Sequence, residues 1–128
     1  MGKRFASDLS RIIRKAGANM DAVAALTCQD LGQLVVEGTP VDTGFARGSW
    51  QPSLNSGTTT GTGEPLSQLA LVTAQMQAGD RFFFLNNTRY ILRLEYGWSQ
   101  QAPNGMVRIA LAQAKAIAEG HARRLRGK

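Results

Sequence analysis

One acidic triplet in the chain, Asp42-Thr43-Gly44, has the residue types and the spacing of a catalytic carboxylate. Such a carboxylate can share a proton with a second one, and the pair can then act as general acid and general base on a peptide bond. A single triplet in a chain of 128 residues would suit a dimer in which each subunit supplies one carboxylate. The residues around the triplet indicate whether it does this chemistry or forms a turn.

The neighbours of Asp42 favour a turn over a dimeric aspartic protease of the retroviral type. Such proteases are almost entirely β, whereas here a helical apolar series precedes the triplet and ends at Gly38. Pro40 stops a helix, and Asp42 can accept backbone hydrogen bonds in an Asx-type turn. Gly44 supplies a permissive backbone. We therefore expect a helix-to-strand corner at 39–44 and keep the protease as a remote alternative.

The other reactive side chains offer little material for catalysis or metal binding. The chain has one cysteine, Cys28, and one histidine, His121. A lone cysteine cannot form an intrachain disulfide, and its helix-forming neighbours indicate a small buried hydrophobe. The glycine-rich stretch 55–64 lacks the lysine of a phosphate-binding loop, because Glu64 follows its last glycine. We therefore expect no enzymatic activity, no cofactor and no metal.

The chain is basic, and its charge is unevenly placed. The formal net charge is +6 and the sequence pI is about 10.3, with basic residues gathered at both ends. Such a field favours a polyanion or an acidic protein surface as partner, and solubility explains it equally well. The residues for which we expect contact with DNA or with an acidic partner are Arg11, Arg14, Lys15, Arg123, Arg124 and Arg126.

Length and apolar content predict one domain that covers residues 1–128. Hydrophobic residues make up 43% of the sequence, which is enough for a core. No apolar run approaches the ~18 residues that a membrane-spanning helix needs. The basic N-terminus lacks the apolar region of a secretory signal. We therefore expect no membrane contact.

Hydrophobic periodicity predicts the elements that position the corner around Asp42. A long helix is expected over 4–38, with a break at 17–19 allowed by Gly17. The corner should lead into a strand at 46–54, in which Trp50 faces the core. Pro52 argues for an edge position in the sheet, because proline cannot donate to a ladder.

The second half of the chain should add three helices and one more strand. We expect a flexible loop at 55–64, a helix that ends at Gly79, and an aromatic strand at 81–85. Thr88 should cap a helix ending at Gly97, and Asn104 should cap the last helix, before a basic tail at 121–128. The order predicts an α+β fold, in which a small antiparallel sheet packs with a long N-terminal helix and a C-terminal helix.

Two stretches, TPVDTGFARGSW and AGDRFFFLNNTRYILRLEYGWSQQAPNGMVRIAL, resemble the head–tail connector and tail-completion (neck) proteins of long-tailed bacteriophages. Members of that family show a P-V-D-T-G-x-x-R-x-S/N-W corner, a strand ending in N-N/D, then Y-A-x-x-L-E-Y-G and S-x-Q-A-P-x-G-M-V-R. The matching residues are Pro40 to Gly44, Arg47, Ser49, Trp50, Asn86, Asn87, Tyr90, Leu94 to Gly97, Ser99, Gln101 to Pro103 and Gly105 to Arg108. The chain departs from the pattern at Ile91 and at the bulky Trp98.

The resemblance implies a non-enzymatic virion component that forms a closed homo-oligomeric ring, expected to be sixfold, in the neck of the particle. It implies assembly in the host cytoplasm. The partners would be portal or adaptor proteins on the head side and tail-tube or tail-terminator proteins on the tail side. Passing DNA could make non-specific contacts. A free, non-specific nucleic-acid-binding protein is the alternative, although the sequence lacks a recognisable reader element.

A ring subunit needs two different surfaces that fit each other, and aromatic residues are enriched at the centres of such interfaces. The residues expected to serve the interface or the structure around it are Asp42, Arg47, Trp50, Tyr90, Glu95, Tyr96, Trp98 and Arg108. We expect Glu95 and Arg108 to pair, within or between subunits, and to hold the loop between them. Rescue by exchange of the two charges would support the pair.

Overall fold

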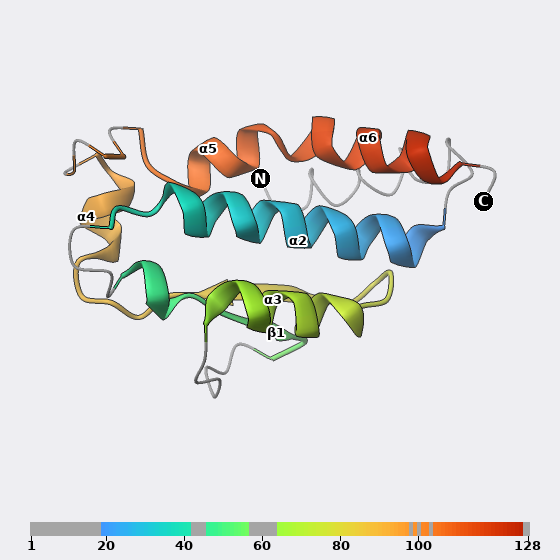
Figure 1. Cartoon of the computed structure of the whole chain (residues 1–128), viewed down its shortest axis with the longest axis horizontal. Helices are drawn as coiled ribbons and strands as arrows, with labels where there is room; N and C mark the ends of the chain where they lie inside the picture. Colours follow the sequence, from blue (N-terminus) through green and yellow to red (C-terminus); the bar gives the residue numbers. More distant parts are fainter. Residues whose placement is uncertain are drawn as a thin grey trace.

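The helices and strands are arranged around α2 (Met20–Gly38) in the computed structural model of Figure 1, which describes residues 19–41, 46–56, 64–97, 99, 101–102 and 104–126. The other elements are the 3-10 helix η1 (Arg47–Ser49), β1 (Gln51–Leu54), α3 (Pro65–Ala74), β2 (Phe82–Leu85), α4 (Ile91–Glu95), α5 (Val107–Ala112) and α6 (Ala114–Leu125). Helices α5 and α6 lie along one side of α2, and α3 with the sheet lies on the other (Figure 1). The predicted α+β fold with a small antiparallel sheet is confirmed.

The described part of the N-terminal helix starts at Met20, so one continuous helix over 4–38 is wrong at this point. Asn19 has an extended backbone (φ −67°, ψ 110°), and its side chain accepts a hydrogen bond from the amide of Ala22 at 3.1 Å. This is N-cap geometry, which starts a helix and cannot lie inside one. A helix start at Met20 agrees with the break that the sequence allowed at 17–19. The residues before Asn19 lie outside the described part.

The two strands form one antiparallel pair, in which Gln51 faces Leu85 and Leu54 faces Phe82. Side chains alternate across the sheet, so Phe82 and Phe84 share a face. Their rings stack at 6.1 Å, and Trp50 stacks on Phe84 at 5.2 Å. The aromatic strand at 81–85 and the core position of Trp50 are thus confirmed.

The strand predicted over 46–54 is wrong in its first half, where the chain forms η1. This tight turn brings Arg47 and Trp50 back to the end of α2. Arg47 donates from Nε to the carbonyl of Val36 at 3.0 Å and from Nη2 to that of Glu37 at 3.2 Å. The last carbonyls of a helix have no partner within it, and a cation there also complements the helix dipole. Arg47 therefore caps α2.

Thr39 completes the end of α2 and connects it to the core. Its hydroxyl donates to the carbonyl of Val35 at 2.7 Å and accepts from Nε1 of Trp50 at 2.9 Å. Both side chains are buried. The helix stop expected from Gly38 and Pro40 is confirmed, and these hydrogen bonds fix the direction in which the chain leaves.

Replacing Thr39 by Val should cost about 1–3 kcal/mol of unfolding free energy, because a buried indole N–H and a helix carbonyl lose their partner. The matched control is Thr27→Val. Thr27 is equally buried on the same helix, but its hydroxyl has no hydrogen-bond partner. That change should be neutral or slightly stabilising. Equal losses in urea unfolding of the two variants would contradict the role given to Thr39.

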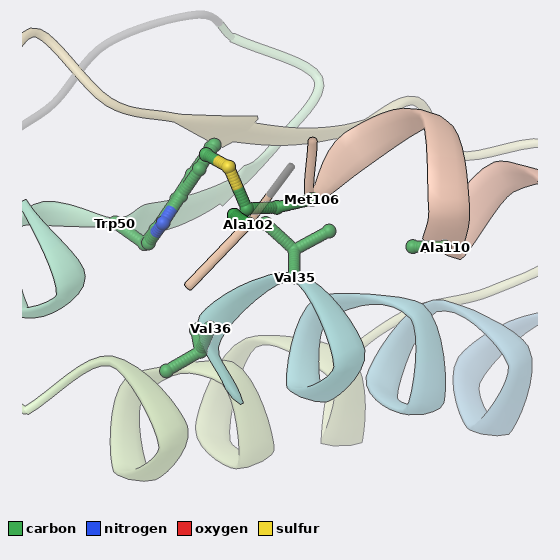
Figure 2. Packing of buried hydrophobic residues seen from close by; sticks show 6 residues of the cluster. All are labelled: Val35, Val36, Trp50, Ala102, Met106 and Ala110. Atoms are coloured by element: carbon green, nitrogen blue, oxygen red, sulfur yellow. The ribbon is translucent and has the colours of Figure 1, made fainter. Parts of the chain in front are cut away.

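The core lies where α2, β1, β2, α4 and α5 meet. Its buried residues are Val35, Val36, Trp50, Ala102, Met106 and Ala110, and Figure 2 shows Met106 beside Trp50. On the other side of α2, buried Gly32 faces Leu69 of α3. A Cβ atom at residue 32 would lie 2.7 Å from Cδ2 of Leu69, so the absence of a side chain lets the two helices approach closely.

The C-terminal half differs from expectation at three element ends. Thr88 does not cap α4, because Tyr90 occupies the N-cap position and makes no side-chain cap bond. Asn104 does not cap the last helix, which is instead two helices that meet at Gln113. The tail predicted to begin at residue 121 is helical to Leu125, because His121 and Ala122 are buried in α6.

Helix α3 is shorter than expected from the sequence, and its first turn is capped by an acidic side chain. Helix α3 ends at Ala74, before Gly79. Glu64 caps its start, accepting from the amides of Leu66 at 3.1 Å and Ser67 at 2.9 Å. Most of the predicted loop 55–64 lies outside the described residues.

Candidate assembly site at the α4–α5 junction

Glu95, the last residue of α4, caps the start of α5 with its carboxylate. Oε1 accepts hydrogen bonds from the amides of Met106 at 2.9 Å and Val107 at 2.8 Å, and Oε2 accepts one from the amide of Arg108 at 3.1 Å. The first amides of a helix have no partner inside it and carry its positive dipole end. A carboxylate delivered from another helix satisfies both, so Glu95 joins α4 to α5.

Arg108 closes this arrangement from the solvent side. Its Nε lies 2.9 Å from Oε2 of Glu95, and its Nη2 donates to the carbonyl of Glu95. The predicted pairing of Glu95 with Arg108 is therefore present within one chain. The Glu95 side chain is 14% exposed and the Arg108 side chain 56% exposed. The carboxylate is thus the buried member of the pair.

Glycines make room for the Glu95 carboxylate. Gly105 has φ +85°, and a Cβ atom there would lie 2.5 Å from the carbonyl oxygen and 2.6 Å from Oε2 of Glu95. Gly97 ends α4 with φ +86°. Both positive φ values favour glycine. At Gly97 and Gly105, therefore, a residue with a Cβ atom would strain the backbone, and at Gly105 it would also collide with Glu95.

Hydrogen bonding keeps Glu95 ionised. Burial alone would raise its pKa, but the amides of Met106, Val107 and Arg108 and the Arg108 guanidinium outweigh burial and hold the pKa below its ordinary value of 4.5. The group acts as a fixed negative charge at neutral pH. Its partners among the described residues are backbone amides and a guanidinium, and through them it positions α4 against α5.

Acid should therefore weaken the fold through Glu95. A carboxylate with a lowered pKa contributes stability above its unfolded pKa of 4.5, and this contribution is lost as the pH falls through the folded value. We expect the free energy of unfolding in urea to fall as the pH drops below about 5, because the Glu95 carboxylate is protonated more readily in the unfolded chain than in the folded one. Glu95→Gln should be less stable at neutral pH and should show a shallower fall.

Some acid dependence should remain in Glu95→Gln. Glu64 and Asp80 also have lowered pKa values, because the amides of Leu66 and of Gln77, respectively, donate to them. An unchanged slope in Glu95→Gln would contradict the role of Glu95.

Described residues that match the family pattern in the two similar stretches meet at one end of the molecule. The amide of Val41 donates to Oε1 of Gln101 at 2.9 Å, and Nδ2 of Asn86 donates to the carbonyl of Ala46 at 2.8 Å. Figure 2 shows Trp50 of the first stretch against Met106 of the second. Segments up to 60 residues apart in sequence thus form one structural unit at the α4 end of Figure 1.

An exposed apolar face lies beside this unit. Leu92 and Tyr96 are one helical turn apart on α4 and are 67% and 68% exposed. The guanidinium of Arg108 lies over the Tyr96 ring, 5.3 Å from its centre, in cation–π geometry. Among the expected interface aromatics that the structure describes, Tyr96 is the exposed one. Trp50 is buried in the core, and Tyr90 is half-buried just before α4.

The remaining expected contact residues fall into two groups. Asp42, Trp98, Arg11, Arg14 and Lys15 lie outside the described residues. Arg123, Arg124 and Arg126 are exposed along the last turns of α6 and at its end. Arg124 contacts Nδ1 of His121. The basic residues of the C-terminus are therefore presented by a helix.

The two unique reactive side chains have structural roles. Burial raises the pKa of Cys28 to about 12, so its thiol stays protonated at neutral pH. Nε2 of His121 lies 2.6 Å from Oδ2 of Asp30, and this contact joins α6 to α2. This pair was not predicted from sequence, because its members are 91 residues apart and neither has a local signal.

The described residues contain neither a cluster of metal ligands nor a membrane-spanning helix. No three His, Cys, Asp or Glu side chains gather closely enough there to hold an ion. None of the described helices is both long enough and apolar enough to cross a bilayer. Comparisons of the chain with protein-family models, with curated proteins and with solved structures found no match.

Proposed function

We propose that this chain is a non-enzymatic structural subunit of a phage virion, which forms a ring at the neck and joins the head connector to the tail. The observation that carries the proposal is the convergence of the two similar stretches at one end of the molecule. Their residues contact one another through Val41 and Gln101 and through Ala46 and Asn86, and Trp50 packs with Met106 in one core cluster. A set of short motifs that folds into one unit supports the resemblance better than scattered motifs would.

The chemistry of this unit suits a protein that acts by shape. Glu95 and Arg108 are engaged with backbone and with each other, and Arg47 with the end of α2. The side chains left exposed beside them are Leu92 and Tyr96, which offer apolar and aromatic area to a partner. The proposed partners are further copies of the chain, the portal or adaptor on the head side, and the tail tube or tail terminator on the tail side.

Electron microscopy of the purified chain, with mass measurement in solution, tests the proposal. We expect closed rings of six copies, and we expect antibody against the chain to label the top of the tail in purified particles. The control is the same preparation with Leu92→Asp and Tyr96→Asp, whose charges should disperse the rings without unfolding the chain. A monomer that is missing from particle fractions would contradict the proposal.

Non-specific binding of nucleic acid is the second candidate, and one observation favours it. Lys115 and Arg123 are exposed on α6, and Arg126 is exposed just after its last residue. Such a surface would contact phosphates without reading sequence, and its affinity would fall steeply with salt. Binding of random duplex DNA by the wild-type chain, lost at higher salt and in a variant with these residues changed to Gln, would favour it. If the chain does not bind duplex DNA, or binds it independently of salt, an acidic protein surface would be the better partner for the basic helix.

A further inference from the structure

We propose that copies of this chain join head to tail, with the α4 face of one copy docked into a groove between α2 and α3 of the next. The inference rests on the proposed ring and deepens it by naming the two surfaces. A ring needs two different surfaces on each subunit, because a contact between identical surfaces ends with a dimer. The molecule offers such a pair at its two ends.

The first surface is the projecting α4 face. Leu92 and Tyr96 are the two most exposed large hydrophobic residues among those described. Because Leu94 and Ile91 pack inward against the core, α4 is held in place while its outer face stays uncovered. Arg89 and Arg93 are exposed on either side of Leu92 in sequence. The surface is therefore a small apolar projection with a basic rim.

The second surface is a groove of about 460 Å³ between the first half of α2 and the end of α3. Its lining is mostly small and apolar, with Ala22, Ala25 and Leu26 from α2 and Ala70 and Ala74 from α3. Small side chains leave depth for inserted ones, and this volume lies within the ~300–1,000 Å³ of ordinary binding sites. Leucine and tyrosine side chains are suitable occupants.

Charge distinguishes a second copy from other apolar partners. Asp21 lines the groove and is exposed, with its Oδ1 accepting from the amide of Ala78 at 2.7 Å. Asp80 lies in the same turn as Ala78. The acidic residue in the lining, Asp21, therefore complements the positive charge that Arg89 and Arg93 of a second copy would bring. Helix α6, which carries Arg123 and Arg124, lies on the side of α2 opposite α3 (Figure 1).

The two surfaces lie at opposite ends of the long axis of the molecule. In Figure 1, α4 is at one end, and the start of α2 and the end of α3 are toward the other. Residues at opposite ends cannot meet within one chain, so the α4 projection can fill the groove only of another copy. Repeating this contact produces a chain of copies that closes into a ring when the rotation per copy divides a full turn.

Cross-linking between two different variants tests this contact. Leu92→Cys and Ala74→Cys are made separately in a Cys28→Ala background, mixed, and treated with a short bifunctional maleimide. We expect covalent dimers in the mixture and few with either variant alone. The matched control is Leu71→Cys, which is exposed on α3 but does not line the groove. It should give at least tenfold less dimer with Leu92→Cys.

Three results would overturn the docking. Equal cross-linking by Leu71→Cys and Ala74→Cys would show that the groove is not the contact. Strong self-cross-linking of Leu92→Cys would indicate a symmetric contact instead. An Ala74→Cys thiol that stays unreactive in the dissociated monomer would show a groove filled by its own chain. Rings seen in the microscope despite any of these results would leave the proposed function standing, whereas the absence of rings would remove both.

Discussion

Exchanging the charges of Glu95 and Arg108 should not restore the stability that either single change removes. We expect Glu95→Arg with Arg108→Glu to be at least as unstable as Glu95→Ala, which should lose about 3 kcal/mol or more of unfolding free energy. Rescue would be expected if the ion pair were the main interaction. Here the carboxylate also accepts from three backbone amides at the start of α5. A guanidinium at residue 95 has no acceptor with which to replace those bonds.

The single changes separate the two roles of Glu95. Arg108→Ala removes a partner that is more than half exposed, so it should cost about 1 kcal/mol or less. Glu95→Gln keeps the length of the side chain and one acceptor oxygen, and should fall between Arg108→Ala and Glu95→Ala. Chemical unfolding at pH 7 measures the whole series. Recovery of wild-type stability in the exchanged variant would show that the amide bonds contribute little.

Gly105→Ala should lose about 3 kcal/mol or more, and the loss should exceed that of Gly79→Ala. Both glycines have positive φ, which costs a residue with a Cβ roughly 1–3 kcal/mol. A Cβ atom at residue 79 would meet nothing within 4 Å, whereas one at residue 105 would collide with the backbone and carboxylate of Glu95. The difference between the two variants therefore isolates the displacement of Glu95.

Gly105→Ala also reports on the proposed assembly. If it loosens α4 from α5, the Leu92 and Tyr96 face should lose its fixed position. The proposed rings should then dissociate at protein concentrations where those of the wild-type chain persist. Thermal unfolding is measured on both glycine variants, and ring mass on Gly105→Ala and the wild-type chain. Equal destabilisation of the two glycine variants would show that the close approach at Gly105 relaxes without cost.

The contact between Glu95 and Arg108 could be predicted from the sequence, but the capping of α5 by the Glu95 carboxylate could not. Both residues flank one loop within the similar stretch, and opposite charges so placed are natural partners. The capping bonds depend on the path of the backbone between residues 97 and 106, which no spacing rule specifies. Asn104 was the expected cap because its type and position fit. A carboxylate from α4 replaced it.

At the C-terminal end of α2, the position of the stop could be predicted from sequence, but the side chains that cap it could not. Gly38 and Pro40 carry a strong stop signal, and the stop is where they place it. The residues that satisfy its last carbonyls, Thr39 and Arg47, depend on how η1 turns the chain back. The division between α5 and α6 at Gln113 has no local cause in sequence, since neither glycine nor proline lies there. Contacts made across the fold override weak local preferences at such places.

The close approach of Gly32 to Leu69 has a consequence far from both residues. Because the buried Gly32 has no side chain, Leu69 packs directly against the backbone of α2, and the two helices approach more closely than a larger residue would allow. The same two helices form the walls of the proposed docking groove, which lies further along their length. A larger residue at position 32 would press on the buried Leu69 side chain and push the two helices apart. A substitution at this buried position would thereby change the width of the proposed groove, although Gly32 does not itself line it.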